Sequence, residues 1–200
     1  MAYLPRHQGQ VGRGSTSRRD CGPRSVQMGI DALTHGQLVP DIPDLRIRMG
    51  TPGNVTTNVY DAERGVESYD HVPGRHDLHY RVVRTTGEAK DAVLHGRPVQ
   101  LAIDYGDLNR TGRTGDPNFR DGHSVLVKGQ RNRGSTIEWR LFDPLDDGRR
   151  QGIPQGPRWV SRERLVSALE AFQPGTVYAG VFTGGASRGG APGMSAGRDR

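Results

Sequence analysis

The sequence of 200 residues contains a single cysteine, Cys21. One cysteine forms neither an internal disulfide nor a cysteine-rich metal cluster, so the chain is not a disulfide-stapled secreted scaffold. The sequence also lacks any run of about 18 consecutive apolar residues, the length that a membrane helix needs. Its amino terminus, MAYLPRHQGQ, lacks the apolar core of a secretory signal. We therefore expect no membrane association and no signal peptide, and Cys21 is either a buried hydrophobic residue or a reactive thiol.

Glycine-rich phosphate-binding motifs of the Walker and Rossmann kinds are also absent, which excludes the common nucleotide-dependent enzymes. Two groups of potential metal ligands do occur, namely Asp70, His71, His76, Asp77 and His79, and Asp104, Asp107, Asp116 and Asp121. The first group matches no standard zinc spacing and the second is not an EF-hand, so both read as loop residues. We expect no metal and no cofactor.

The net charge of +6 comes from the two ends of the chain. Residues 20–183 carry 21 basic and 21 acidic side chains, whereas residues 1–19 carry four arginines and no acid. We therefore divide the chain into a basic extended N-terminal arm (1–19), one domain (20–183) and a flexible Gly-rich basic tail (184–200). Nucleic acid is the least favoured partner, because the arms contain one aromatic residue, Tyr3.

The order of the predicted elements indicates an α+β fold. Apolar residues at helical spacing predict a helix over about 22–35, an amphipathic helix over 161–172, and weaker helices over 54–64 and 87–94. Short β-branched or aromatic runs predict antiparallel strands over 80–83, 98–103, 123–127, 136–142 and 176–182. The polar segment 104–122 reads as a long loop of the kind that binds a ligand or covers a site. This order does not show the strand and helix alternation of a parallel sheet.

Cys21 is predicted at the N-terminal edge of the first helix. Unpaired N–H groups and the helix dipole stabilise a thiolate at this position. Its flanks, Ser-Arg-Arg-Asp before it and Gly-Pro-Arg after it, are not those of an apolar core position. A general base is expected at His123, which opens a predicted strand, and an orienting acid at Asp143, which ends the next one. If those strands form a hairpin, Asp143 lies beside His123; the alternatives are an ordinary core histidine and a turn aspartate before Pro144.

These three motifs together resemble the papain-like cysteine peptidases. Asp-Cys-Gly-Pro-x-Ser at a helix start, then Gly-His-Ser-Val-Leu-Val, then Phe-Asp-Pro about twenty residues later, is similar to the C39-like group, which includes bacteriocin-leader peptidases and peptidase domains of actinobacteriophage endolysins. The resemblance implies a papain-like fold, in which a helix carrying Cys21 packs on an antiparallel sheet carrying His123 and Asp143. It further implies a nucleophile, a general base and an orienting acid at these positions, and a thioester mechanism.

Two positions depart from that pattern. The family usually places a glutamine a few residues before the cysteine to stabilise the oxyanion, but here Ser15 stands six positions upstream and the glutamine nearest to it is Gln10. Arg24 replaces a small residue and is expected to narrow the cleft or to bind an acidic group of the substrate.

The sequence therefore leaves two functions open. The first is a cysteine peptidase or amidase acting on peptide bonds, with bacterial cell-wall peptides in a phage context as the expected substrate. The second is a virion component, in a tail or capsid, that keeps the fold with weak or lost activity and contacts other virion proteins through its basic arms. The expected location is the virion or the cytoplasm of an infected bacterium.

Overall fold

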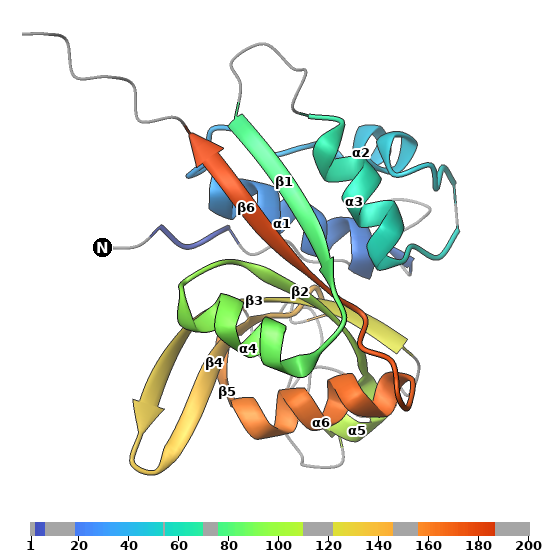
Figure 1. The fold of residues 1–200 in the computed structure, drawn as a ribbon. Helices are drawn as coiled ribbons and strands as arrows, with labels where there is room; N and C mark the ends of the chain where they lie inside the picture. Colours follow the sequence, from blue (N-terminus) through green and yellow to red (C-terminus); the bar gives the residue numbers. More distant parts are fainter. Residues whose placement is uncertain are drawn as a thin grey trace, which may run out of the picture.

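A computed structural model describes residues 3–6, 19–53, 55–69, 76–109, 122–145 and 156–186. Its centre is a six-stranded antiparallel sheet with the strand order β1-β6-β2-β3-β4-β5 (Figure 1). The strands are β1 (His76–Val83), β2 (Val99–Asp104), β3 (Gly122–Arg133), β4 (Thr136–Phe142), β5 (Arg158–Ser161) and β6 (Ala179–Ala186). The helices are α1 (Cys21–Leu33), α2 (Ile42–Arg48), α3 (Val59–Glu67), α4 (Thr86–Leu94), α5 (Tyr105–Asn109) and α6 (Arg162–Phe172). The predicted α+β class is confirmed.

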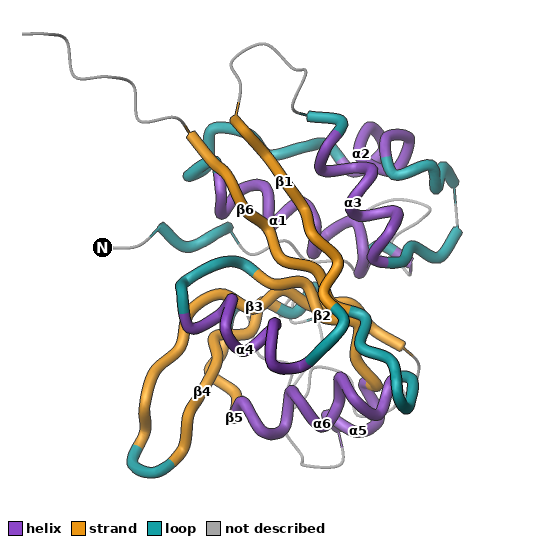
Figure 2. The backbone as a smooth tube through the Cα atoms, in the orientation of Figure 1, coloured by secondary structure: helices purple, strands orange, loops and turns teal. Residues whose placement is uncertain are grey.

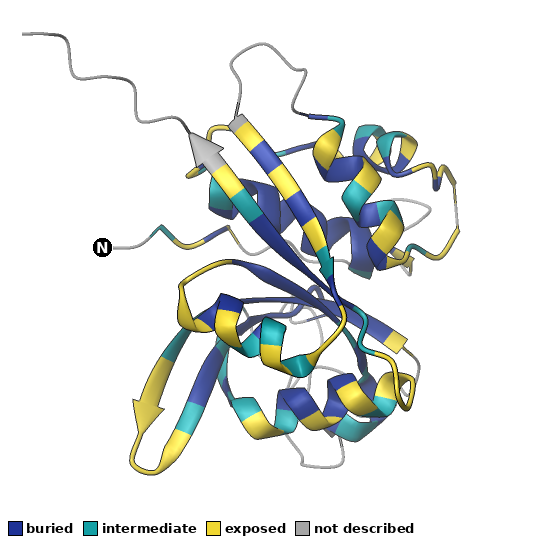
Figure 3. Ribbon diagram, viewed as in Figure 1, coloured by how far each residue is buried: buried dark blue, intermediate teal, exposed yellow. Residues whose placement is uncertain are grey.

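The sheet separates two hydrophobic cores, because successive residues of a strand point to opposite faces. Helices α1–α3 and the residues facing them, among them Leu126 and Phe142, form the first core. Helices α4–α6 and their facing residues, among them Val125 and Leu141, form the second. Figure 2 shows the two helical groups on either side of the strands, and Figure 3 shows the buried residues concentrated where helices meet strands. Each core is therefore closed by its own three helices.

Helix α1 is buried along nearly its whole length. Its Val26 and Ile30 are fully buried in the first core, as their helical spacing predicts. Gly29 faces β6, where a Cβ atom would overlap with the Phe182 ring, so glycine allows the helix to lie close to the sheet. This close packing fixes the position of the helix and of its first residue, Cys21.

Helix boundaries in the first half differ from the prediction. Helix α3 begins at Val59, not near residue 54, because Asn58 caps it: Asn58 Oδ1 accepts from the backbone N–H groups of Tyr60 and Asp61, and Asp61 accepts from that of Asn58. Helix α2 was not predicted, since its seven residues are too few to show a clear period. The predicted loop 104–122 begins instead with the last residue of β2 and helix α5, and residues 110–121 lie outside the described part.

Several strands are longer than predicted or shifted. β1 begins at His76, and β3 continues to Arg133 through an irregularity between Val127 and Gln130, where Gly129 has a φ of 94°. β5 was not predicted. β6 spans Ala179–Ala186 and pairs along its length with β1, so the expected tail boundary at 184 is wrong: residues 184–186 belong to the sheet. Residues 187–200 lie outside the described part.

Part of the N-terminal arm contacts the body of the protein. Tyr3 donates its hydroxyl to Asp31 Oδ1 at 2.9 Å, and the backbone N–H of Arg6 donates to the other oxygen of that carboxylate. Asp31 is fully buried near the C-terminal end of α1. Residues 3–6 of the arm are therefore bound to the helix that begins with Cys21.

Candidate active site

Cys21 is the first residue of α1 and is half-buried. The chain before it is held by a buried ion pair: Arg46 Nε lies 2.8 Å from Asp20 Oδ1, and both side chains are almost fully buried. Arg46 also donates to the backbone carbonyl of Arg19 at 2.7 Å. One guanidinium from α2 therefore holds both residues that precede the cysteine.

Gly22 allows the loop before α3 to lie against the start of α1. A Cβ atom at Gly22 would collide with the hydroxyl of Thr57. The absence of a side chain at this position therefore lets the loop carrying Thr57 pack directly against the start of α1. Pro23 has no N–H, and the Arg24 N–H donates to the Asp20 carbonyl at 2.7 Å. The backbone N–H groups of Cys21 and Gly22 are thus the donors that the helix start offers near Sγ.

The structure brings His123 and Asp143 together through the β3–β4 hairpin. The antiparallel register pairs Leu126 with Phe142, so His123, near the start of β3, lies beside the residue that follows β4. His123 Nε2 is 2.7 Å from Asp143 Oδ1, and both side chains are fully buried. The pairing expected from the sequence is therefore present. Asp143 occupies Nε2 of the His123 ring, and the same ring lowers the pKa of the Cys21 thiol.

The Asp143 carboxylate also accepts hydrogen bonds from one backbone N–H group and from two side chains. Its Oδ1 also accepts from the Leu145 backbone N–H at 2.9 Å. Its Oδ2 accepts from the Tyr105 hydroxyl at 3.0 Å and from Arg158 Nη2 at 3.2 Å. The Tyr105 ring also meets the His123 ring edge-on, with centroids 4.8 Å apart. Tyr105 and Arg158 thus fix the acid, and Tyr105 also fixes the imidazole.

Neither Tyr105 nor Arg158 was predicted from the sequence as part of the site. Tyr105 fell in the predicted loop 104–122, and Arg158 lies in an unpredicted strand. Neither carries a local signal, because each acts on a partner more than ten residues away that only the folded chain brings near.

Cys21, His123 and Asp143 shift one another's pKa values toward the charged forms. Burial raises the pKa of the Cys21 thiol, but the hydrogen bond and the charge of His123 outweigh burial, and the pKa is lowered from its ordinary value. Burial lowers the pKa of His123, but the Asp143 carboxylate and Cys21 raise it to about 10. The pKa of Asp143 is lowered despite burial, by His123 and Arg158. The arrangement therefore favours a thiolate beside an imidazolium, the state in which a cysteine is nucleophilic.

The structure gives less information about the other predicted site residues, which are Gln10, Ser15 and Arg24. Gln10 and Ser15, the expected oxyanion donors, lie outside the described residues. Arg24 is buried within α1, and its Nη1 donates to Gln27 Oε1 at 3.0 Å. Its expected role toward substrate stays a prediction.

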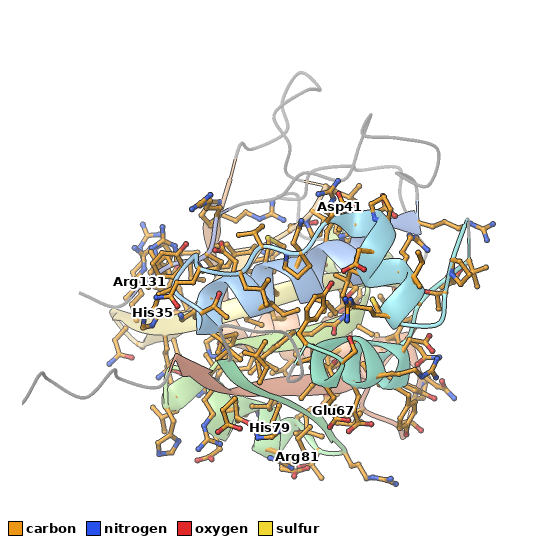
Figure 4. All side chains as sticks on the ribbon, turned by 90° about the horizontal axis from the view of Figure 1, so that it is seen from above. His35, Asp41, Glu67, His79, Arg81 and Arg131 are labelled. Atoms are coloured by element: carbon orange, nitrogen blue, oxygen red, sulfur yellow. The ribbon has the colours of Figure 1, made fainter. Side chains whose placement is uncertain are left out.

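Within the described part of the chain, no three His, Cys, Asp or Glu side chains are grouped as metal ligands. Exposed His79 pairs with Asp77 at 2.8 Å, on the outer side of β1, where Figure 4 shows His79 near Arg81. Asp104 Oδ1 accepts from the Asp107 backbone N–H at 2.9 Å. The other members of these groups, apart from the His76 backbone, lie outside the described residues. Among the described helices, none has the length and apolar character needed to cross a bilayer.

Comparison with known proteins supports the fold. No protein-family model matches the sequence, and no curated protein matches it significantly. Among solved structures, the chain is similar to the peptidase domain of ComA from Streptococcus, described as a bi-functional ABC transporter involved in a quorum sensing pathway. The TM-score is 0.56 at 14% sequence identity, over 92% of this chain and 99% of that domain. The predicted papain-like arrangement of helix and sheet is thereby confirmed.

Proposed function

We propose that the protein is a cysteine peptidase or amidase that hydrolyses peptide bonds with Cys21, His123 and Asp143. One observation carries this proposal: a thiol at a helix start has its pKa lowered by a buried imidazole, whose Nε2 lies 2.7 Å from a buried carboxylate. A nucleophile, a base and a group that orients the base are the parts that acyl transfer requires. The similarity to a peptidase domain adds support at the level of the fold.

In the proposed reaction, the Cys21 thiolate attacks the carbonyl carbon of the scissile amide and forms a carbon–sulfur bond. The His123 imidazolium gives its proton to the leaving nitrogen as the carbon–nitrogen bond breaks. Water then attacks the thioester and gives a proton to the imidazole, which releases the carboxylic acid and restores the thiolate and imidazolium. Asp143 keeps the imidazole oriented throughout. The Cys21 backbone N–H is one donor for the oxyanion, and Gln10 or Ser15 is proposed as the second.

Bacterial cell-wall peptides are the substrate class we propose to test first, because the sequence motifs resemble those of phage endolysin peptidase domains. The basic residues of the arms, such as Arg6, suit the anionic polymers of a cell wall as well as neighbouring virion proteins.

The proposal is tested by incubating the protein with purified peptidoglycan and with a peptide library, and by detecting new amino groups. Cys21→Ala and His123→Ala are expected to abolish release, while His95→Ala, a change at an exposed histidine, leaves it unchanged. Turnover that persists in Cys21→Ala would reject the assignment. A folded wild-type protein that cleaves neither substrate and whose thiol has an ordinary pKa would favour the virion-component alternative.

A further inference from the structure

Ser124 contacts the nucleophile helix through its backbone. Its carbonyl accepts from Ser25 Oγ at 3.0 Å, and its backbone lowers the pKa of the Cys21 thiol. Ser25 follows Cys21 by one helical turn, so both residues lie on the face of α1 that meets β3. The position of the Ser124 backbone therefore decides how its N–H group is placed relative to the thiolate.

The Ser124 side chain is held by a buried amide from the neighbouring strand. Gln100 Nε2 donates to Ser124 Oγ at 2.7 Å. In the β2–β3 register, Gln100 pairs with Leu126 and Ser124 pairs with Ala102, so the two side chains are diagonal neighbours on one face of the sheet. Gln100 is 3% exposed, and its hydrogen bonds are therefore not exchanged for water.

The same amide is held at its other end by a residue two strands away. The Tyr80 hydroxyl donates to Gln100 Oε1 at 2.8 Å, although β6 lies between β1 and β2. Gly180 of β6 makes this contact possible, because a Cβ atom there would overlap with the Tyr80 ring. Burial raises the pKa of Tyr80 well above its ordinary value, so its hydroxyl remains a donor.

These contacts form one chain of hydrogen bonds, from Tyr80 through Gln100 to Ser124, on the face of the first core. Apolar side chains would fill this space without the cost of burying polar groups. The three buried polar side chains therefore point to a role beyond packing. We propose that Gln100 is a positioning residue that holds the Ser124 backbone against Cys21, with Tyr80 fixing the orientation of the Gln100 amide. The inference rests on the proposed function, because it concerns the same nucleophile.

The test measures the rate of Cys21 alkylation by iodoacetamide against pH, which requires no substrate. Gln100→Met keeps the length of the side chain and removes both hydrogen bonds. The midpoint of the profile is expected to rise by about one pH unit, because a hydrogen bond to the thiolate is weakened. Tyr80→Phe should give a smaller rise in the same direction.

Tyr69→Phe is the matched control. It also removes a hydroxyl from a tyrosine of the first core, one that donates to Asp44 at 2.6 Å, away from Cys21. The melting temperature of each variant is measured in parallel. A merely structural role for Gln100 lowers the melting temperature and leaves the midpoint in place, and that result would overturn the inference. If Gln100→Met does not fold, Ser124→Ala removes the same hydrogen bond from its other end, and an unchanged midpoint there overturns it equally.

The two proposals fail in different ways. A lowered wild-type midpoint that rises in Gln100→Met, without hydrolysis of any peptide, supports the role of Gln100 and rejects the peptidase. Hydrolysis together with a midpoint that does not respond to Gln100→Met or Ser124→Ala rejects the role of Gln100 alone. A wild-type midpoint at the ordinary thiol value of about 8.5 overturns both.

Discussion

His123 keeps its proton well beyond neutral pH, because the Asp143 carboxylate and Cys21 outweigh burial and raise its pKa to about 10. The pKa of Cys21 is shifted the other way. We therefore predict that kcat/KM rises as the thiol ionises, stays level while thiolate and imidazolium coexist, and falls as pH passes about 10. A profile measured on a cleaved peptide checks this, and a decline that begins between pH 6 and 7 would contradict the raised pKa of His123.

Tyr105 offers a second prediction for a single residue. Tyr105→Phe removes the 3.0 Å hydrogen bond to Asp143 and keeps the ring against His123. We expect kcat to fall about tenfold with KM unchanged, because one hydrogen bond to a charged group that orients the base is lost. Asp143→Ala should cost more, since it removes every contact of the carboxylate. Tyr60→Phe, at an exposed tyrosine of α3, is the control and should have no effect on kcat.

The sequence indicated the proposed reacting groups more clearly than the residues that contact them. Cys21, His123 and Asp143 each stand at the end of an element with a visible period, so their positions follow from local patterns. Tyr105 and Gln100 support them from α5 and β2, across 38 and 24 residues of sequence. Local patterns carry no information about such pairings, because the pairings depend on strand register and on the order of strands in the sheet.

Among the elements, the start of α1 is the one on which the site depends most closely. Gly22→Ala places a methyl group against the Thr57 hydroxyl, so we predict a loss of activity and a destabilisation of about 1–3 kcal/mol, measured by urea unfolding. Thr57→Gly in the same chain should restore part of both. An unaffected Gly22→Ala variant would show that the loop moves freely away from the start of α1.

Gly87→Ala is the matched control for this prediction. Gly87 is also the second residue of its helix, α4, but a Cβ atom there meets only Thr85 Oγ1 at 3.8 Å, an ordinary contact. Alanine favours a helix over glycine by about 1 kcal/mol, so this variant should be neutral or more stable. The opposite effects of one substitution at equivalent positions would separate the contact with Thr57 from helix propensity.

The elements that were predicted well have a strong period or a clear stop signal. β4 was predicted with its observed bounds, and α1 and α4 within two residues. α2, α5 and β5 are seven, five and four residues long, too short to show a period. The start of α3 was readable in principle, since Asn58 and Asp61 have the spacing of a capping box.

At the scale of the whole molecule, the ionised pair couples stability to pH. The raised pKa of His123 contributes stability that is complete below its unfolded value of 6.5 and is lost as pH rises through about 10. The lowered pKa of Cys21 acts in the opposite sense, because folding then releases the proton of the thiol. In the wild-type protein the two contributions oppose each other above pH 6.5, since the imidazole gains a proton as the thiol loses one.

Cys21→Ala removes this compensation. We predict that its free energy of unfolding falls between pH 7 and 9 by up to about 1.4 kcal/mol per pH unit, the slope for one proton. The wild-type protein should show a clearly smaller slope over the same range. Urea denaturation at several pH values measures both slopes, and His123→Ala, which lacks the imidazole, provides the reference. Equal slopes for Cys21→Ala and the wild-type protein would contradict a thiolate in the folded state.

The residues of the proposed site come from elements of both hydrophobic cores. Cys21 belongs to the helix packed in the first core, whereas Tyr105, which steadies His123 and Asp143, belongs to the second. We therefore expect the contact between Cys21 and His123 to depend on the alignment of the two helical layers across the sheet. We therefore predict that heating slows Cys21 alkylation at a lower temperature than it unfolds the two cores.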